Sequence, residues 1–368
     1  MLKVINVISD SNIGGAGTQL LTFLRGYDRG AMSVTVALPR GSQLINRLKE
    51  AGTEYTELDG LADRSLSGGG IISLAKFLRA EQPNIVHTHA SMSARIAARA
   101  VPRARIVYTR HSVFPNKRAV TVFPGKQLYG AVNNFFAHKI IAVSPAARDN
   151  IIEAGVNPKK IEVIFNGVEA VNRLTPEEKR ETRGANGLPE DAFLCGTFAR
   201  LTPVKGHEYI LDAAKLLHNN KGIKIVIAGA GELEAALKER AAKEGLDNVI
   251  FKGFVQDAPR VIASMDLLLN ASYGTEATSL FLLEGMSAGV PAVVSCYGGN
   301  PYVIKDGSNG LVTPVRDGNA IAEAVTRIAG DPVMYRKLSK HAVETYNERF
   351  TAELMVKNIE RLYFSMFK

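Results

Sequence analysis

Two acidic and two basic residues in the second half of the 368-residue chain lie at positions where a charged side chain is expected to need an ion-pair partner or a bound ligand. Glu284 lies inside the segment SLFLLEGMSAGVP, which has no other charged residue, and Glu276 precedes that segment. Arg200 and Lys205 follow the β-rich run FLCGTF. A carboxylate in apolar surroundings is costly unless it is paired or ligand-bound. Two cations beside a strand end can hold a diphosphate, so we expect a phosphorylated ligand here.

The segment around Glu284 is predicted to be a helix whose amino end binds an anion. Thr278 or Ser279 can cap its start. The backbone amides of Ser279 and Leu280 would then lack partners within the helix, and the helix dipole favours negative charge at that end. We therefore expect a phosphate at these amides, between Glu276 and Glu284.

The first half of the chain has a glycine-rich loop at a similar position. Gly14, Gly15 and Gly17 follow the strand-like run KVINVIS and precede the helical run TQLLTFLRGY. Glycines there let the backbone approach a ligand, and the amides at the helix start favour phosphate. The loop is neither a GxGxxG fingerprint nor a P-loop, so a purely structural role for these glycines stays open.

Three histidines also lie at strand ends. His87 and His89 end the run NIVHTH, and His111 follows RIVYTR. An HxH pair at a strand end can bind a metal ion. The other four histidines lie in or beside predicted helices, which disfavours a metal site. Ordinary structural histidines and a position beside a bound ligand are the two remaining interpretations.

Alternating strands and helices must position all of these residues. Short Val/Ile-rich runs alternate with helical patterns up to about residue 170, and the same alternation restarts near Phe193. This pattern predicts an α/β protein with two doubly wound parallel sheets, residues 1–170 and residues 171–349. A last helix, about 350–368, is expected to pack back on the first domain. Ligands bind outside the carboxyl ends of parallel strands, where the candidate residues lie.

The net charge of +9 is unevenly distributed. The stretch Gln82 to Arg148 contains no Asp or Glu at all. Within it, residues 115–139 mix Lys and Arg with Phe, Tyr and Val, as interfacial segments do. This stretch predicts contact with an anionic membrane surface or a lipid-diphosphate acceptor, although a solvated basic face explains it as well. Nucleic-acid binding would rest on net charge alone, and we do not expect it.

Composition restricts the remaining classes. Hydrophobic residues make up 46% and charged residues 22%, which excludes disorder and fibrous folds. The two cysteines cannot build a disulfide scaffold or a metal site. No apolar run fits a membrane-spanning helix, and the first residues lead directly into a strand without the layout of a signal peptide. We therefore expect a cytoplasmic protein, with docking on the inner face of the membrane as an option.

Glu276 and Glu284 form an E-x7-E pair, and with Arg200 and Lys205 the chain closely resembles the retaining family 4 glycosyltransferases of the GT-B fold. The resemblance covers essentially the whole length. Further matching motifs are IGGAG at 13–17, TRHS at 109–112, AVS at 142–144, FNGVE at 165–169, AGAGELE at 228–234 and YGGNPYVIKDGSNGLV at 297–312. It implies two Rossmann-like domains that face each other across a crevice.

The resemblance also implies a role for each matching residue. Glu276 would contact hydroxyls of the donor sugar, and Glu284 the ribose of the nucleotide. Cations would stabilise the departing diphosphate. The implied catalytic residues are His111, Arg200, Lys205 and Glu276; the implied donor-binding residues are Gly15, Arg200, Lys205, Gly229, Ser279, Leu280 and Glu284; Gly14 and His111 would lie on the acceptor side.

The implied reaction moves a hexose or N-acetylhexosamine from a nucleotide-diphosphate sugar, with a UDP-sugar favoured, to a glycan or lipid-linked acceptor in cell-surface synthesis. No cofactor is expected, and the absence of a D-x-D motif predicts that no metal bridges the diphosphate. We assign no protein nucleophile.

Three positions depart from the family pattern. Gly17 stands where many relatives have Glu, Ser112 where many have Asp, and Tyr302 where many have Glu. The first two affect the acceptor side and the third affects the donor contact near Gly298.

Two alternative functions stay open. One is an enzyme of the same fold with another reaction, a nucleotide-sugar epimerase or a phosphorylase. The other is a non-catalytic subunit that binds a nucleotide sugar.

Overall fold

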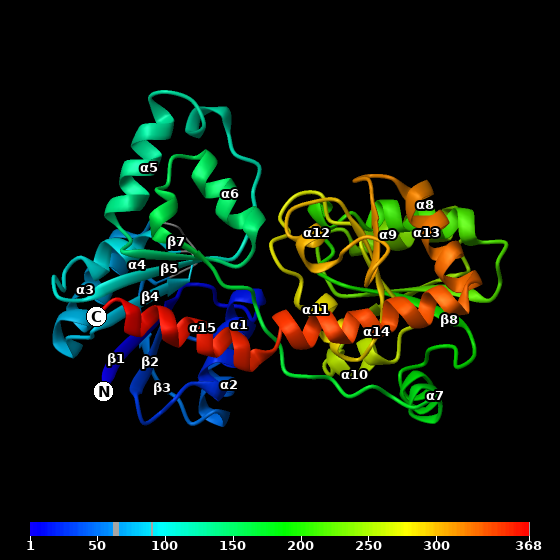
Figure 1. Ribbon diagram of the computed structural model, residues 1–368, viewed down its shortest axis with the longest axis horizontal. Coiled ribbons are helices and arrows are strands. Elements are labelled where there is room, and N and C mark those ends of the chain that lie inside the picture. Colours follow the sequence, from blue (N-terminus) through cyan, green and yellow to red (C-terminus); the bar gives the residue numbers. More distant parts are fainter. Residues whose placement is uncertain (62–65, 90, 368) are drawn as a thin grey trace. The chain divides into compact units, whose positions relative to one another are not determined.

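The computed structural model describes residues 1–61, 66–89 and 91–367. The chain forms two compact units (Figure 1). The first unit combines Met1–Gly167 with Ala352–Lys368, and the second is Val168–Thr351. Each unit is built around one parallel sheet.

Within the described residues, the first unit has a seven-stranded sheet in the order β3-β2-β1-β4-β5-β6-β7. The strands are β1 Leu2–Ile8, β2 Met32–Pro39, β3 Glu54–Leu58, β4 Ile85–His89, β5 Arg105–Arg110, β6 Lys139–Ala142 and β7 Ile161–Val163. All neighbours pair in parallel. Most of these strands are buried along much of their length, as parallel strands covered on both faces should be.

Helices connect the strands of the first unit. They are α1 Gly15–Gly26, α2 Leu44–Glu50, α3 Gly68–Glu81, α4 Met92–Ala98, α5 Gly125–Phe135, α6 Pro145–Glu153 and α15 Ala352–Ser365, with short 3-10 turns at Arg118–Val120 and Pro158–Lys160. Residues of α1 and α15 pack with Val4 and Ile8 of β1 on one face of the sheet, and α3 and α4 pack with Ile5 and Val7 on the other. This alternation follows from the two-residue period of a strand.

The last helix belongs to the first unit. Helix α15 contacts α1, beside which it is drawn in Figure 1. Its Tyr363 is fully buried and packs edge-on against Phe23 of α1. The hydroxyl of Tyr363 hydrogen-bonds to Nδ1 of His87 on β4, at 2.6 Å. The end of the chain is thereby tied to the strand that carries the HxH pair.

The second unit has a six-stranded parallel sheet within the described residues, in the order β10-β9-β8-β11-β12-β13. Its strands are β8 Phe193–Phe198, β9 Ile223–Ala228, β10 Val249–Gly253, β11 Leu267–Asn270, β12 Ala292–Ser295 and β13 Gly310–Thr313. Its helices are α7 Pro176–Ala185, α8 His207–Leu217, α9 Glu234–Lys243, α10 Ala258–Ala263, α11 Leu280–Ser287, α12 Asn300–Val303, α13 Gly318–Gly330 and α14 Pro332–Arg349, with a 3-10 turn at Pro203–Lys205.

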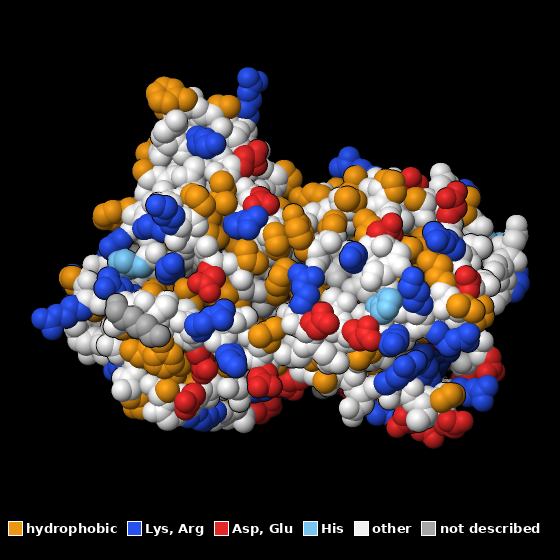
Figure 2. Space-filling view, viewed as in Figure 1, with side chains coloured by type: hydrophobic (Ala, Val, Ile, Leu, Met, Phe, Trp, Pro, Cys, Tyr) orange, Lys and Arg blue, Asp and Glu red, His pale blue; other side chains and the backbone are white. Residues whose placement is uncertain are grey.

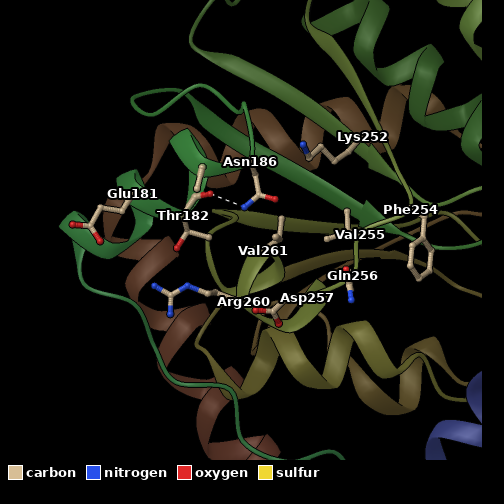
Figure 3. A pocket seen from close by; sticks show the side chains of 11 residues that line it. Glu181, Thr182, Asn186, Lys252, Phe254, Val255, Gln256, Asp257, Arg260 and Val261 are labelled. Atoms are coloured by element: carbon tan, nitrogen blue, oxygen red, sulfur yellow. Dashed lines mark hydrogen bonds between the residues drawn. The ribbon is translucent and has the colours of Figure 1, made fainter. Parts of the chain in front are cut away.

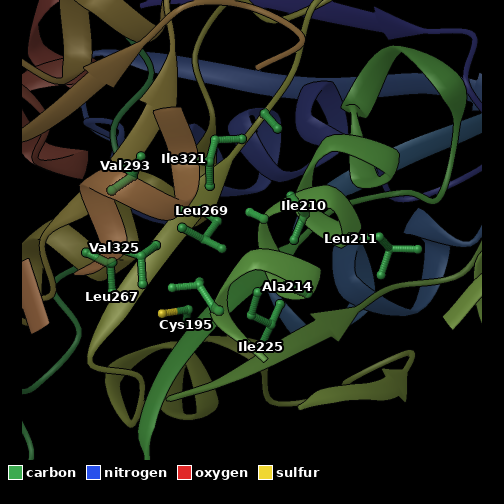
Figure 4. Packing of buried hydrophobic residues seen from close by; sticks show 14 of the residues in the cluster. Cys195, Ile210, Leu211, Ala214, Ile225, Leu267, Leu269, Val293, Ile321 and Val325 are labelled. Atoms are coloured by element: carbon green, nitrogen blue, oxygen red, sulfur yellow. The ribbon is translucent and has the colours of Figure 1, made fainter. Parts of the chain in front are cut away.

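The core of the second unit holds its strand ends in place (Figure 4). Leu267 and Leu269 of β11 meet side chains of α8 and α13, such as Ile210 and Val325. Full burial of such a side chain stabilises the fold by roughly 1.5–3 kcal/mol. These contacts anchor β11, whose carboxyl end leads to Glu276.

Each sheet has a switch point, where the order of strands changes direction. In the first unit it lies between β1 and β4, and in the second between β8 and β11. Loops after two such strands run to opposite sides and leave room for a ligand at the strand ends. The predicted α/β class with two doubly wound sheets is confirmed.

Candidate functional site

The switch point of the second unit brings together residues that are distant in sequence. Arg200 and Lys205 follow β8, and Glu276 follows β11, the strand paired with β8. Because the two strands are parallel neighbours, their following loops begin at the same edge of the sheet. The topology therefore explains how residues from positions 200 and 276 can meet.

Lys205 and Glu276 form an ion pair. The Nζ atom of Lys205 lies 2.8 Å from Oε2 of Glu276, and their side chains are 18% and 7% exposed. Asn270 Nδ2 and Ser272 Oγ also donate to this oxygen, at 3.3 and 3.1 Å. Among the described residues, no hydrogen-bond donor reaches Oε1. The carboxylate is thus held through Oε2, and Oε1 can accept hydrogen bonds from hydroxyl groups of a ligand.

Asn270 and Ser272 are site residues that the sequence analysis missed. Asn270 ends β11 and its Oδ1 accepts the amide of Ser272 at 3.1 Å, so the two residues form one turn under Glu276. Both are buried. The signal was present in the run LLLNAS, where an otherwise apolar strand ends in polar residues that need partners.

Gly298 and Gly299, in the loop after β12, support the backbone of Glu276. The amide of Gly299 donates to the carbonyl of Glu276 at 3.1 Å, and Gly298 has a φ of +56°. A Cβ on Gly298 or Gly299 would collide with the backbone of Glu276 or Ala277, respectively. Glycine is therefore required at both positions so that the two loops can touch.

Helix α11 presents an open amino end. Ser279 is its N-cap residue in extended conformation, but its side chain accepts no hydrogen bond from the first turn. Serine at an N-cap usually makes such a bond. The amides of the first turn therefore stay available to an acceptor from outside the helix, which is the arrangement that binds phosphate. Of the two cap residues considered from the sequence, Ser279 occupies the position.

Glu284 lies on the second turn of α11 and keeps partial exposure. Burial raises its pKa to about 7, because the surroundings penalise the ionised form. Neighbouring Leu283 and Gly285 are buried, as the apolar sequence predicted. A carboxyl group with so high a pKa and some access to solvent is suited to meet a ligand that donates hydrogen bonds.

A cavity of about 350 Å³ lies at the ends of β8 and β9. Arg200 and Gly229 line it from those two strands, and Phe254 and Val255 line it from the loop after β10. Gly229 has a φ of +139°, and a Cβ there would strike the carbonyl of Ala199. Arg200 is exposed. The cavity wall is mostly apolar, and Arg200 adds a cation to it.

A larger hollow of about 530 Å³ lies nearby and shares Phe254 and Val255 with that cavity (Figure 3). Its wall carries charges of both signs, including Glu181, Lys252 and Arg260. It contains none of the site residues expected from the sequence. We do not assign it a ligand.

The candidate residues of the first unit lie at its own switch point or one strand away from it. Gly14 and Gly15 start α1 after β1, and His111 directly follows β5. Gly15 is exposed, and a Cβ there would have nothing within 4 Å, so the space above it is open. This is the room that a ligand at the helix start would need.

His111 belongs to a ladder of three buried or half-buried histidines. Its Nε2 lies 2.9 Å from Nδ1 of His89, and the rings of His89 and His87 stack at 4.5 Å. His87 is held by Tyr363 and by Thr109 Oγ1, each at 2.6 Å. These imidazoles bond to one another and to hydroxyl groups. Within the described residues, no cluster of His, Cys, Asp or Glu is arranged to hold a metal ion.

The ladder is uncharged at neutral pH. Burial is the main cause that lowers the pKa of His89 to about 4. Burial, with the charges of His89 and Arg110, holds the pKa of His111 well below its usual range. Neutral imidazoles can both donate and accept hydrogen bonds, so His111 can recognise a hydroxyl group.

Two family models match the chain. The model described as Glycosyltransferase Family 4 matches residues 13–171, and the model described as Glycosyl transferases group 1 matches residues 178–345. Together they span both units.

Curated relatives match over most of their length. The chain is 29% identical to "UDP-Gal:alpha-D-GlcNAc-diphosphoundecaprenol alpha-1,3-galactosyltransferase" of Escherichia coli, over 97% of this chain and 98% of that one. It is 28% identical to the putative glycosyltransferase EpsD of Bacillus subtilis, over 77% of each chain.

Solved structures share the fold. HepE of Anabaena, whose crystal structure contains UDP-glucose, superposes with a TM-score of 0.86 at 21% identity, covering 99% of this chain and 100% of that one. TarM of Staphylococcus aureus reaches 0.78 at 14% identity, with 99% and 100% covered.

Proposed function

The chain belongs to the family 4 glycosyltransferases of the GT-B fold, and from this premise we propose that it transfers a hexose or N-acetylhexosamine from a UDP-sugar to a lipid-linked or glycan acceptor, with retention of the anomeric configuration. The galactosyltransferase from Escherichia coli supports the choice of UDP and of a lipid-linked acceptor, because its name specifies both. The galactosyl group itself is one candidate among the hexoses.

The observation that carries the proposal is the Lys205–Glu276 pair beside the open amino end of α11. In a sugar transfer, negative charge develops on the diphosphate as it leaves the anomeric carbon. Fixed cations and backbone amides stabilise such charge most when they are positioned before the reaction. Lys205, Arg200 and the amides of Ser279 and Leu280 supply these groups, and Glu276 orients the sugar through its hydroxyls.

Glu284 suits the ribose of the nucleotide. Two vicinal hydroxyls can donate to one carboxylate, and such bonds favour its ionised form. The raised pKa of Glu284 means that burial makes the ionised carboxylate costly in the protein alone. Binding of a ribose would supply the missing hydrogen bonds. The cavity that Arg200 and Gly229 line would then take the base.

The first unit carries a surface suited to an anionic membrane. Its exposed apolar residues include Phe123, Leu128 and Phe135, at 79%, 68% and 61% exposure. Lys117 and Arg118 are exposed in the same segment, just before α5. Figure 2 shows apolar and basic side chains together over this part of the molecule. We call residues 114–135 the α5 surface and propose that it docks on anionic lipid, where a lipid-linked acceptor resides.

No membrane-spanning segment accompanies this surface in the described part of the chain, where every helix is too short or too polar to cross a bilayer. Each basic residue near an anionic membrane contributes about 1 kcal/mol, so several are needed together.

A product assay tests the proposed function. Radiolabelled UDP-galactose, UDP-glucose, UDP-N-acetylglucosamine and UDP-N-acetylgalactosamine are each incubated with the protein and a polyprenyl-diphosphate sugar in detergent. We expect label from one donor to enter the lipid phase, with an α-linkage. A donor epimer formed without acceptor would instead identify an epimerase. Binding of UDP without turnover of any donor would identify a non-catalytic subunit.

A further inference from the structure

A buried asparagine connects to the histidine ladder of the first unit. Asn6 lies on β1, and its Oδ1 is 3.2 Å from Nε2 of His89 on the neighbouring strand β4. The other ring nitrogen of His89, Nδ1, is 2.9 Å from Nε2 of His111. Asn6 on β1, His89 at the end of β4 and His111 just after β5 therefore form one continuous chain of hydrogen bonds, which we call the relay.

The orientation of the Asn6 amide determines where the protons lie: its Oδ1 faces His89, and its Nδ2 is buried without a partner among the described residues. Both histidines are neutral, so each ring has one N–H and one bare nitrogen. With the oxygen of Asn6 as acceptor, Nε2 of His89 carries the proton and its Nδ1 accepts. Nε2 of His111 must then donate to that Nδ1. The bare nitrogen of His111 is left as Nδ1.

That last nitrogen has no partner in the protein. Nδ1 of His111 is buried, and no residue within the described part of the chain hydrogen-bonds to it. A buried polar atom without a partner costs free energy, and this one lies one strand away from the switch point, so we infer that a hydrogen-bond donor from outside the protein satisfies it. An unprotonated imidazole nitrogen accepts hydrogen bonds and cannot donate them. Its partner must therefore be a hydroxyl or amide N–H, and a carboxylate or phosphate oxygen is excluded at this atom.

We propose that Asn6 and His89 are positioning residues that fix His111 in its Nε2-protonated tautomer, so that Nδ1 accepts a hydrogen bond from a hydroxyl or amide N–H of the sugar substrate. This proposal rests on the proposed function and deepens it. It assigns the exclusion of carboxylate and phosphate oxygens at Nδ1 of His111 to Asn6, which is three hydrogen bonds away from the ligand. His87 stands outside the relay, because Tyr363 and Thr109 occupy both of its nitrogens.

The first test needs no substrate. Two-bond ¹H–¹⁵N spectra of the full-length protein with ¹⁵N-labelled histidine distinguish the two neutral tautomers, and single His→Gln variants assign the signals. We expect Nε2-protonated rings for both His89 and His111. A proton on Nδ1 of either ring in the wild-type protein overturns the proposal, whether or not sugar transfer is ever detected.

Variants of Asn6 separate positioning from packing. Asn6→Asp keeps an oxygen acceptor and should retain the tautomer of His111, whereas Asn6→Leu removes the acceptor and should mix its tautomers. Loss of the partner that orients a metal-ligating histidine lowers activity about 10- to 100-fold, and we take this range as the guide for a ligand-binding histidine. We expect that fall in kcat/KM for Asn6→Leu, with partial rescue in Asn6→Asp and an unchanged Kd for UDP.

Thr88→Val is the matched control. Thr88 is fully buried between the two histidines of β4, and its hydroxyl donates to the carbonyl of Val107. The Thr88→Val substitution can lower stability without removing a hydrogen bond of the relay. The kcat/KM and the histidine spectra of this variant should therefore match those of the wild-type protein. If Asn6→Leu loses stability but keeps the tautomer of His111, Asn6 is merely structural and the proposal is wrong. If no donor is turned over, the proposed function fails while the spectra still decide this inference.

Discussion

Lys205 Nζ and Glu276 Oε2 lie 2.8 Å apart although 71 residues separate them in the sequence. They meet because β8 and β11 are parallel neighbours at the switch point of the second sheet. Asn270 and Ser272 hold the same oxygen. The ion pair thus connects Glu276, which we expect to bind the sugar, to Lys205, which we expect to stabilise the leaving diphosphate.

Removal of the Lys205 charge tests this coupling. Lys205→Ala should lower kcat about 100- to 1,000-fold, the usual loss for one preorganised group at a developing anion. It should also destabilise the fold by about 3 kcal/mol, because Glu276 is left buried without its ion-pair partner. Steady-state kinetics and chemical denaturation measure the two effects. Lys215→Ala on α8 is the control. Its side chain is 64% exposed and pairs with Glu244, so the change should leave kcat intact and cost at most about 1 kcal/mol of stability.

Glu284→Gln should separate stability from binding. The folded pKa of Glu284, about 7, lies above the unfolded value of 4.5, so the folded state binds more protons between these pH values. The stability of the wild-type protein therefore falls as pH rises from about 5 to 7. Glutamine removes this penalty, so at pH 8 the variant should be more stable by about 3 kcal/mol while it binds UDP-sugar more weakly.

Thermal unfolding at pH 5 and pH 8 checks the sign of the Glu284 effect. The gain in Tm should appear at pH 8 and be small at pH 5. Glu239→Gln on the exposed face of α9 provides the comparison and should show no such gain. An equal change in Tm at both pH values would show that the gain in stability does not come from removing the ionised Glu284 carboxylate.

Two glycines with positive φ provide a matched pair. Gly298→Ala should cost activity, because its Cβ would strike the carbonyl of Glu276 and displace the loop that carries the carboxylate. Gly307 has a φ of +67°, but a Cβ there meets nothing within 4 Å. Gly307→Ala should therefore cost about 1 kcal/mol of stability and leave kcat intact. Equal activities of the two variants would disprove the supporting role of Gly298.

The α5 surface should bind anionic vesicles. The triple variant Lys117→Gln, Arg118→Gln, Lys126→Gln should bind phosphatidylglycerol vesicles about 100-fold more weakly at low salt, from about 1 kcal/mol for each charge. Sedimentation measures the bound fraction. Phe123→Ser should also weaken binding, whereas Val333→Ser, equally solvent-facing on α14 of the other unit, should not. A wild-type protein that stays in the supernatant contradicts the proposed docking.

Sugar transfer should continue in the presence of EDTA. We expect Lys205, Arg200 and the α11 amides to supply the positive charge that a metal would otherwise bring to the diphosphate. The initial rate with chelator should equal the rate with added Mg²⁺. A rate that falls in EDTA and recovers with Mg²⁺ or Mn²⁺ would show that these groups do not suffice.

Sequence patterns predicted the architecture well because strand and helix periods repeat regularly in a doubly wound fold. They did not indicate β3, β7 or β13, which are short or lie at an edge of a sheet. β7 is only partly buried, so the apolar run that marks a central strand is absent there. Helix α11 was predicted from its apolar run, and Ser279 was named as a possible cap.

The contacts around the site depend on topology, which composition does not reveal. Nothing local marks Lys205 as the partner of Glu276, since strand order brings them together. The same holds for Asn6, which reads as one polar residue in a buried strand until β1 and β4 are paired. The roles of the site residues stay predictions until the variants are measured.

The most direct measurement is the Tm of the wild-type protein and of Glu284→Ala with UDP and a panel of UDP-, GDP-, ADP- and dTDP-sugars. A ligand at 100 times its Kd stabilises the fold by about 2.7 kcal/mol, which a melting curve resolves readily. We predict that UDP and one UDP-sugar raise the Tm of the wild-type protein and leave that of Glu284→Ala nearly unchanged. A panel without any shift, or a shift that survives in the variant, would contradict the proposed nucleotide-sugar site.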